Sequence, residues 1–345
     1  MCSARAPDGA DKETAMEEKS FYLETASHDP AYNLAFEEYV LTHRMEGSYL
    51  ILWQNDNTVV VGQNQNTQEE IDCRYVEEHG VHVVRRMTGG GAVYHDLGNI
   101  NYSFITDRQG DDLVFTRFTE PIVQALRALG LDAEASGRND ILVAGQKVSG
   151  TAQRYYQGRV LHHGTLLFDS DLDKVALALR ADPLKFRSKA SKSVRRRVGN
   201  IRALLPQDME LPAFWDHLKR SLLGGSYEEL SLGADELAQV DALKAEKYDT
   251  WEWNYGRSPR CEMNNKQAWP GGILSVSMNV ADGRITEIAF HGDFLSTRPM
   301  TELVTALRGT PYRAEEVGAV LDRMPLAELF GAITRDEVLA TMFYF

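Results

Sequence analysis

Hydrophobic residues recur along the chain with two different spacings, which predict a mixture of helices and strands. Apolar positions three or four residues apart indicate the buried face of a helix, and this pattern occurs at 32–44, 67–79, 115–129, 172–180, 212–223 and 234 to about 248. Short apolar or alternating runs predict strands at 49–53, 58–62, 140–153 and 158–168, with two or three more within 81–106. Because strands and helices do not alternate regularly, the pattern favours an α+β fold over a doubly wound sheet.

The pattern changes beyond residue 250. Two alternating runs at 272–279 and 284–290 predict strands joined by an Asp282-Gly283 turn, and three short helices are expected at 300–307, 313–322 and 335–342. Residues 1–20 contain no Leu, Ile, Val or aromatic residue, which is typical of a disordered tail. We therefore expect a tail over 1–20, a first domain over 21–250, a linker over 251–260 and a smaller α+β domain over 261–345.

Composition narrows the class of protein. The 345 residues are 43% hydrophobic, and no apolar run approaches the ~20 residues of a membrane span. A formal net charge of -13 argues against general nucleic-acid affinity. Cys2, Cys73 and Cys261 are too far apart to suggest a disulfide framework or a metal site. A reducing cytoplasm is the simplest compartment for such a chain.

The stretch from Arg85 to Asp96 places two arginines before three consecutive glycines, with a strand-like run on either side. Three glycines cost backbone entropy and add no packing, so they suggest a sharp turn or a backbone that lies against a ligand. Free N–H groups beside a guanidinium would bind an anion, such as a phosphate ester. The alternative is a glycine-rich hairpin whose arginines face water.

A second stretch, from Ser136 to Gln153, carries a candidate cation. If β alternation holds, Lys147 and Ser149 lie on one face and Val148 on the other. Lys147 would then bring a mobile positive charge to a ligand, and Asn139 and Asp140 at the strand entrance are suited to a ribose, an amine or Mg²⁺. The alternative is a solvated surface lysine.

Two further stretches are rich in chemically active side chains. His162 and His163 are neighbours on a predicted strand, so they face opposite sides and only one can reach a pocket, where Gly164 would let a ligand approach closely. The alternative is one core and one surface histidine. From Lys185 to Arg202 there are eight Lys or Arg and no acidic residue, which suggests a loop that closes over a polyphosphate, a solvated charge run or a docking site for an acidic partner.

These blocks, in this order, resemble the lipoate–protein ligase family, of the type with a C-terminal accessory domain. The resemblance rests on Arg85–Asn99, Gly137–Gly150, His162–Leu167, Ser191–Asn200 and the Trp251–Gly256 block. It implies a catalytic domain similar to biotin ligases and class II aminoacyl-tRNA synthetases. It also implies a monomer in which lipoate and MgATP give lipoyl-AMP and the lipoyl group then passes to a lysine of an E2 lipoyl domain or of the glycine-cleavage H protein.

The resemblance also implies roles for individual residues. Lys147 is the expected catalytic residue, contacting both the carboxylate and the α-phosphate, and Asp140 is the expected Mg²⁺ ligand. Expected contacts to ATP and the adenylate are Arg86, Gly91, Ala92, Val93, Tyr94, Asn99, Asn139, Asp140 and Lys147. Expected contacts to lipoate are Trp53, Arg86, Thr88, Gly89, Gly90, Gly91, His95, Lys147, Ser149, Ala152, His163 and Gly164.

Two other functions fit parts of the pattern. An octanoyl or lipoyl transferase of the same fold would need an acyl-thioester cysteine, and the sequence has none between Cys73 and Cys261, the region that holds the motifs. A lipoate-binding protein without turnover would keep the pocket, but an intact Lys147, Asn139 and Asp140 argue against this. A biotin ligase is disfavoured because its Gly-Arg-Gly type of block is missing.

Overall fold

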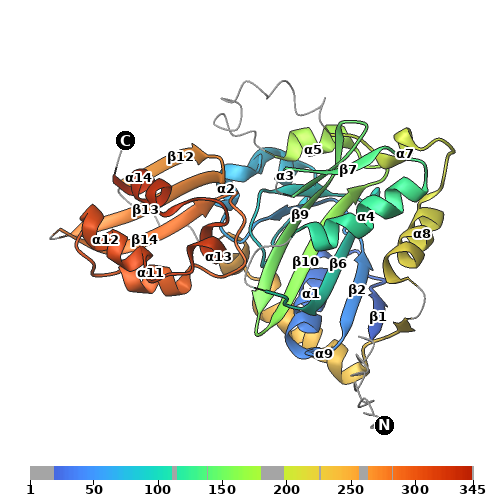
Figure 1. Ribbon diagram of the computed structural model, residues 1–345, viewed down its shortest axis with the longest axis horizontal. Helices are drawn as coiled ribbons and strands as arrows, with labels where there is room; N and C mark the ends of the chain where they lie inside the picture. The colour runs from blue at the N-terminus through green and yellow to red at the C-terminus, as the bar shows by residue number, and fades with distance from the viewer. Residues whose placement is uncertain are drawn as a thin grey trace, which may run out of the picture.

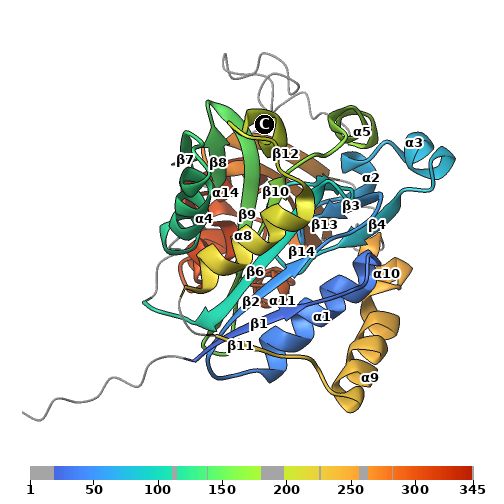
Figure 2. The ribbon, with the colours of Figure 1, turned by 90° about the vertical axis from the view of Figure 1, so that its right-hand side faces the viewer.

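The structure is a computed structural model that describes residues 19–110, 115–137, 139–179, 198–224, 227–255, 263–281 and 283–343. Its largest sheet has the strand order β11-β1-β2-β6-β10-β9-β8-β7 (Figures 1 and 2). The strands are β1 (Ser20–Glu24), β2 (Ser48–Trp53), β6 (Asn99–Asp107), β7 (Ala133–Ser136), β8 (Asp140–Val143), β9 (Gln146–Tyr156), β10 (Arg159–Leu167) and β11 (Glu228–Glu229). The α+β class expected from the sequence is confirmed.

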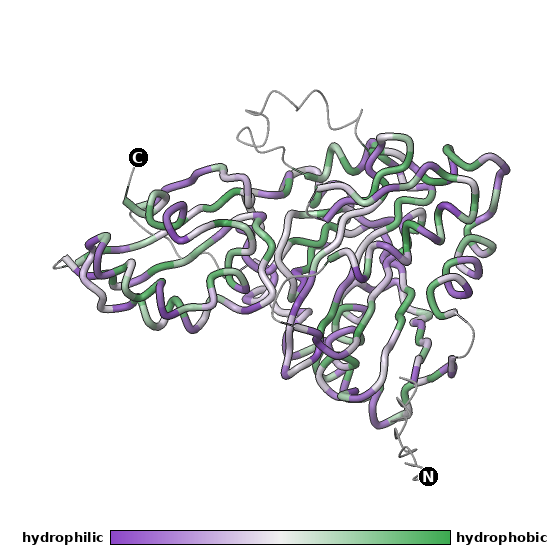
Figure 3. Tube along the Cα trace, in the orientation of Figure 1, coloured by the Kyte–Doolittle hydropathy of each residue, from purple (hydrophilic) through white to green (hydrophobic). Residues whose placement is uncertain are grey.

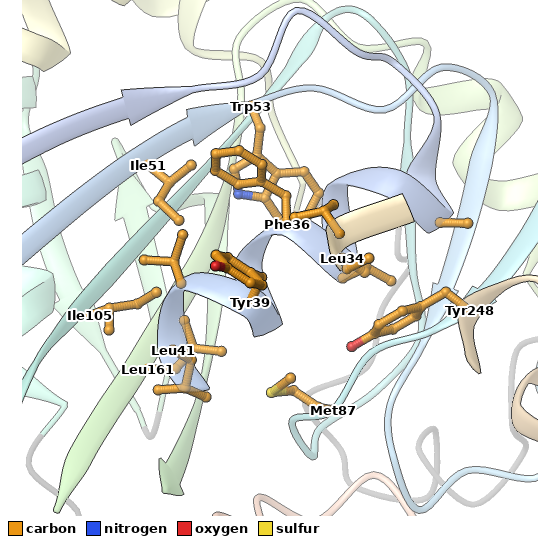
Figure 4. Close-up of a cluster of buried hydrophobic side chains, with 14 of the residues drawn as sticks. Leu34, Phe36, Tyr39, Leu41, Ile51, Trp53, Met87, Ile105, Leu161 and Tyr248 are labelled. Atoms are coloured by element: carbon orange, nitrogen blue, oxygen red, sulfur yellow. The ribbon is translucent and has the colours of Figure 1, made fainter. Parts of the chain in front are cut away.

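Helices cover both faces of this sheet (Figure 2). On one face, α1 (Pro30–His43), α9 (Ala234–Leu243) and the π-helix η2 (Lys244–Tyr248) share an apolar cluster with strand residues. Figure 4 shows α1 placing Phe36, Tyr39 and Leu41 against this sheet. On the other face, α4 (Thr116–Ala128) and α8 (Leu211–Leu223) cover a second cluster, and α7 (Ile201–Leu204) adds Ile201 to it.

A small second sheet carries the glycine stretch. It has the order β4-β3-β5, formed by β3 (Thr58–Val61), β4 (His82–Arg85) and β5 (Val93–His95). β4 runs parallel to β3 and β5 runs antiparallel to it, so β4 and β5 are not paired with each other. The glycines therefore form a crossover between two strands that flank a third, and the hairpin alternative is wrong.

The C-terminal part has a core of its own (Figure 1). The sheet of β12 (Met263–Trp269), β13 (Gly272–Ala281) and β14 (Arg284–Gly292) packs against α11 (Thr301–Leu307), α12 (Ala314–Leu321), α13 (Leu326–Phe330) and α14 (Arg335–Phe343). In Figure 3 hydrophobic and hydrophilic positions alternate along these elements, as expected when each element buries one face. No helix in the described ranges is long and apolar enough to cross a membrane.

Several elements differ from the sequence expectation. The helix expected over 67–79 is two short helices, α2 (Thr67–Glu70) and α3 (Cys73–Glu78), because Ile71 pairs with Leu179 as an isolated β-bridge and Asp72 caps α3. Pro121 lies inside α4 without dividing it. The start of the expected linker is the helix α10 (Trp251–Asn254), which packs on β4. Strands β1, β7, β11 and β12 and the helices α7 and α13 were not predicted.

Candidate active site

A cavity of about 130 Å³ lies where the two sheets of the first part meet. Its walls come from helix α1 and from strands β2, β3, β5, β6, β9 and β10, together with the glycine stretch. The lining residues are Leu34, Trp53, Val60, Arg86, Gly90, Gly91, Ala92, Val93, His95, Asn101, Asn139, Lys147, Gly150, Thr151, Ala152, His163, Gly164 and Thr165. No cysteine is among these lining residues.

The cavity floor is a row of cross-strand partners. Trp53 on β2 faces Asn101 on β6, and Asn101 faces Thr165 on β10. The β9–β10 register aligns Thr165 with Gly150 on β9, and Gly150 faces Asp140 on β8. Since neighbouring strands lie ~4.8 Å apart, the three steps from Trp53 to Gly150 span about 14 Å. The cavity therefore has an aromatic end at Trp53 and a charged end beside Asp140.

A β-bulge brings Lys147 to the charged end. Ile141 pairs with Ser149 and Leu142 pairs with Lys147, so Val148 is an extra residue in β9. Because Ile141 and Leu142 face opposite sides of the sheet, so do Ser149 and Lys147. The expectation that these two share a face is thus wrong: Lys147 lines the cavity, whereas Ser149 is buried on the other side and does not.

The ammonium group of Lys147 is held by a carboxylate. Its Nζ lies 2.7 Å from Oδ1 of Asp140, and both side chains are about one third exposed. A Cβ built on Gly150 would lie 3.3 Å from the same Nζ, so the missing side chain of Gly150 leaves room for the lysine to lie across the sheet. The pair is therefore open to a ligand at the cavity mouth.

Arg86 is a buried cation at the cavity wall. Its guanidinium donates to the carbonyls of Gly89 and Gly91, at 2.7 and 2.8 Å, and to the hydroxyl of Thr88 at 3.0 Å. Burial lowers the pKa of Arg86 to about 10, and the charge of Glu37 acts in the opposite direction. Arg86 thus stays charged at neutral pH, and its positive potential favours an anionic ligand.

The glycine stretch contacts the C-terminal part. The N–H groups of Gly89 and Gly90 donate to the carbonyls of Ser296 and Phe294. A Cβ on Gly89 would lie 2.4 Å from the backbone nitrogen of Ser296, which is closer than real contacts allow. In this structure these two N–H groups serve the contact with the loop after β14 and do not form the anion cradle suggested by the sequence.

The side chain of Arg85 holds parts of the fold together, unlike that of Arg86. Its fully buried guanidinium donates to the carbonyl of Trp253 in α10, to backbone carbonyls of Gly62, Gln63 and Gln65, and to the hydroxyl of Thr67. The indole nitrogen of Trp253 returns a bond to the Arg85 carbonyl at 2.7 Å. Arg85 therefore joins β4 to the Trp251–Asn254 helix and does not line the cavity.

A buried chain of hydrogen bonds runs behind the cavity. The Thr88 hydroxyl donates to Nε2 of His163 at 2.7 Å, and Nδ1 of His163 donates to the Glu37 carboxylate at 2.8 Å. Ser103 donates to the same carboxylate oxygen and accepts from the indole of Trp53. His163 is thus fixed at both nitrogens. His162 lies on the opposite face, stacked on Phe118, so only one of the two histidines reaches the cavity, as expected.

His95 is a neutral ring in the cavity wall. It packs edge-to-face on Trp53 with ring centroids 6.3 Å apart, and it is 3% exposed. Burial, together with the positive charge of Arg86 and the neighbouring imidazole of His163, lowers the pKa of His95 to about 3. The imidazole therefore carries one proton at neutral pH, on a nitrogen that its hydrogen bonds determine.

The structure brings most of the expected residues to the cavity, but not all of them. Thr88 and Gly89 lie behind the lining, in the contacts described above. Tyr94 is buried in an apolar cluster with Val59 and Val61 and donates its hydroxyl to Asn57, and the Asn99 amide donates to Asn101. Asp140 reaches the site through its ion pair with Lys147. The lining residues that were not predicted are Leu34, Val60, Asn101, Gly150, Thr151 and Thr165.

Gly164 lines the cavity with its backbone, but its missing side chain faces elsewhere. A Cβ at this position would lie 2.5 Å from the hydroxyl of Tyr102, on the face of the sheet opposite the cavity. Glycine is needed here to accommodate Tyr102, and its expected role in close ligand approach stays a prediction. Most of the expected basic segment, residues 185–197, and Arg138 lie outside the described residues.

The comparison with known families decides which family the chain belongs to. Residues 29–223 match the lipoyl protein ligase A/B catalytic domain, and residues 258–342 match the bacterial lipoate protein ligase C-terminus. The chain belongs to the lipoate–protein ligase family. The lipoate-protein ligase LplJ of Bacillus subtilis is 43% identical over 318 residues, which cover 90% of this chain and 96% of that protein.

Solved structures of the family share the fold of this ligase. A bipartite lipoate protein ligase of Thermoplasma acidophilum, studied with its E2 lipoyl domain, is 32% identical with a TM-score of 0.62 and covers 72% of this chain and 100% of that one. A lipoate-protein ligase A bound with ATP is 30% identical with a TM-score of 0.60 and covers 70% of this chain and 99% of that one.

Proposed function

We propose that this ligase uses ATP to convert free lipoate to lipoyl-AMP and transfers the lipoyl group to a lysine of an acceptor protein. The observation that carries the proposal is the cavity with two unlike ends. The Trp53 end is aromatic and suits a carbon chain with a dithiolane ring, and the Lys147 end is charged and open. A carboxylate at Lys147 with its tail toward Trp53 matches the ~14 Å floor.

The charged end suits adenylation chemistry. A carboxylate oxygen attacks the α-phosphorus of ATP, a new P–O bond forms, and the bond to pyrophosphate breaks. Negative charge builds on the phosphoryl oxygens during this step, and a cation placed beforehand lowers the barrier. Lys147 would supply that charge, because its ion pair with Asp140 holds the ammonium at the cavity mouth. In the second step the same charge would stabilise the leaving AMP.

Mg²⁺ would arrive as part of the substrate, MgATP. Magnesium bound with nucleotides needs only one or two protein carboxylates, since phosphates and water complete its shell. Asp140 is a carboxylate beside the charged end, and no cluster of three or more acidic, histidine or cysteine ligands occurs among the described residues. This arrangement would fit an ion that comes with ATP and takes Asp140 as its protein ligand.

The proposal extends to partners and domain organisation. The relative from T. acidophilum acts with an E2 lipoyl domain, and we propose the same class of acceptor here, together with glycine-cleavage H protein. We also propose a catalytic domain over 21–250, a linker over 251–260 and an accessory domain over 261–345. The separate apolar cluster of the C-terminal part supports this division. We further propose that the protein is cytoplasmic and acts as a monomer.

The test is ATP–[³²P]pyrophosphate exchange with R-lipoate, followed by mass spectrometry of an E2 lipoyl domain for the added lipoyl group. We expect lipoate-dependent exchange in the wild type and a loss of about 10²- to 10³-fold in Lys147→Ala. Lys174→Ala is the matched control, because Lys174 is also paired with an aspartate but does not line the cavity. Wild-type protein that transfers acyl groups between carrier proteins without any exchange would be a transferase and would overturn the proposal.

A further inference from the structure

A buried ring nitrogen in the cavity wall lacks a hydrogen-bond partner among the described residues. Nδ1 of His95 contacts the side-chain amide of Asn55 at 3.2 Å, whereas its Nε2 has no partner among the described residues. Leaving a buried polar group without a partner is destabilising, so such a group in a ligand cavity points to a partner on the ligand. The chemistry of that partner depends on whether Nε2 donates or accepts.

A chain of three side chains settles this. The amide nitrogen of Asn33 donates to the backbone carbonyls of Ser27 and Gln54, which can only accept, so its orientation is fixed. The same nitrogen also faces Oδ1 of Asn55 at 3.0 Å, so its two hydrogens are shared among three acceptor oxygens, and an Asn55 nitrogen at this point would oppose one donor to another. Asn55 must therefore turn its own nitrogen toward His95, whose Nδ1 accepts. The single proton of the neutral ring is then on Nε2.

The position of His95 indicates which part of a ligand it meets. His95 packs on Trp53, at the end of the cavity floor about 14 Å from Gly150 and the charge of Lys147. Asn101, the strand neighbour of Trp53, also has an amide nitrogen without a partner. Two buried donors thus lie at the end that would hold the tail of an acid whose carboxylate is at Lys147.

We propose that His95 donates an Nε2–H hydrogen bond to a sulfur of the dithiolane ring, and that Asn55 is the positioning residue that fixes the proton on Nε2. Ring sulfur is a weak acceptor, whereas the tail of octanoate offers no acceptor at all. Octanoate would leave the donor unsatisfied, so the arrangement selects lipoate over octanoate. This inference rests on the proposed function and adds the determinant of acyl specificity.

The first experiment measures the proton position directly. Two-bond ¹H–¹⁵N correlation spectra of ¹⁵N-histidine-labelled protein distinguish the two neutral tautomers, and the His95 signal is assigned by its loss in His95→Gln. We expect the Nε2–H tautomer in the wild type and a mixture of tautomers in Asn55→Leu. A wild-type ring protonated on Nδ1, or on both nitrogens at neutral pH, overturns the proposal.

The second experiment measures specificity as the ratio of kcat/KM for lipoate to that for octanoate in pyrophosphate exchange. A neutral hydrogen bond contributes about 0.5–1.5 kcal/mol, so His95→Leu is expected to lower the ratio about two- to thirteenfold. His95→Gln, whose amide can place a donor near Nε2, is the matched variant and should retain most of the ratio. Asn55→Leu should lower the ratio in proportion to the decrease in the fraction of His95 that is protonated on Nε2.

Octanoate is the internal control, because its turnover reports folding and adenylation without the sulfur contact. An unchanged ratio in His95→Leu, with both acids still activated, overturns the specificity role and leaves the proposed function intact. Absence of exchange with either acid in the wild type overturns the proposed function instead. Calorimetric binding of lipoate and octanoate gives the same comparison for a variant that binds but does not turn over.

Discussion

The contact between Gly164 and Tyr102 gives a prediction that can be worked through from the structure. In Gly164→Ala the new methyl group would lie 2.5 Å from the Tyr102 hydroxyl, 2.6 Å from its ring and 2.9 Å from a methyl group of Thr151. The backbone of Gly164 is not left-handed, so the cost is steric. Tyr102 is fully buried and has little space to move. Overpacking of this kind costs about 1–3 kcal/mol, which corresponds to a fall in Tm of about 2–10 °C.

Differential scanning calorimetry of Gly164→Ala, made in the wild type and in Tyr102→Leu, tests whether Tyr102 is the obstacle. In Tyr102→Leu the ring is gone, and we expect the penalty of the added methyl group to shrink or change sign. An equal penalty in both backgrounds would show that Tyr102 is not the obstacle. If Gly164→Ala kept its Tm and raised KM for lipoate, the glycine would instead serve close ligand approach, and the steric argument would be refuted.

Two further perturbations follow from buried charged and titratable groups. Arg85→Met removes the donor to the buried carbonyls of Gln65 and Trp253 and should cost about 1–3 kcal/mol in calorimetry for each acceptor left unpaired, whereas Arg127→Met, which removes the bond to Ala133, should cost less. Equal losses in the two variants would contradict the role of Arg85 as a joint. Burial lowers the pKa of His291 to about 4 and that of His95 to about 3, so between pH 6.5 and 4 the unfolded chain binds protons that the native state does not. The contribution of the two histidines to the free energy of unfolding should be fully present above pH 6.5 and should fall on acidification by about 1.4 kcal/mol per pH unit for each histidine. His291→Gln should therefore reduce the slope of Tm against pH. An unchanged slope would show that His291 does not contribute.

Local patterns were sufficient to predict much of the fold. Helix α1 follows from the apolar spacing over 32–44, and strands β2, β3 and β10 follow from short apolar runs. In each of these elements the apolar residues of one short segment lie on a single face, which is buried. The helix expected over 67–79 failed because Ile71 is drawn into a β-bridge with Leu179, more than 100 residues away. Such a contact leaves no local mark in the sequence.

The site was predictable as a set of blocks but not as a geometry. Alternation assigned Lys147 and Ser149 to one face, and an extra residue in the strand reversed that assignment. Arg85 and Arg86 look equivalent in sequence, yet one joins β4 to Trp253 and the other lines the cavity. Glu37 was missed because an acidic residue in a helix is ordinarily solvated, and only the tertiary fold buries it beside His163.

The bulge at Val148 has a consequence for how this ligase tolerates sequence change. The face on which Lys147 emerges depends on the bulge at Val148 and not on the chemical type of that residue. Deleting Val148 would remove the bulge and make Lys147 the direct neighbour of Ser149, still paired with Leu142, so alternation would keep the lysine on the cavity face. Keeping Val148 in a strand without the bulge would instead turn Lys147 to the buried face of Ser149, although every functional group would remain in the chain. A one-residue gap at this point in an alignment of relatives is therefore compatible with the same active-site architecture.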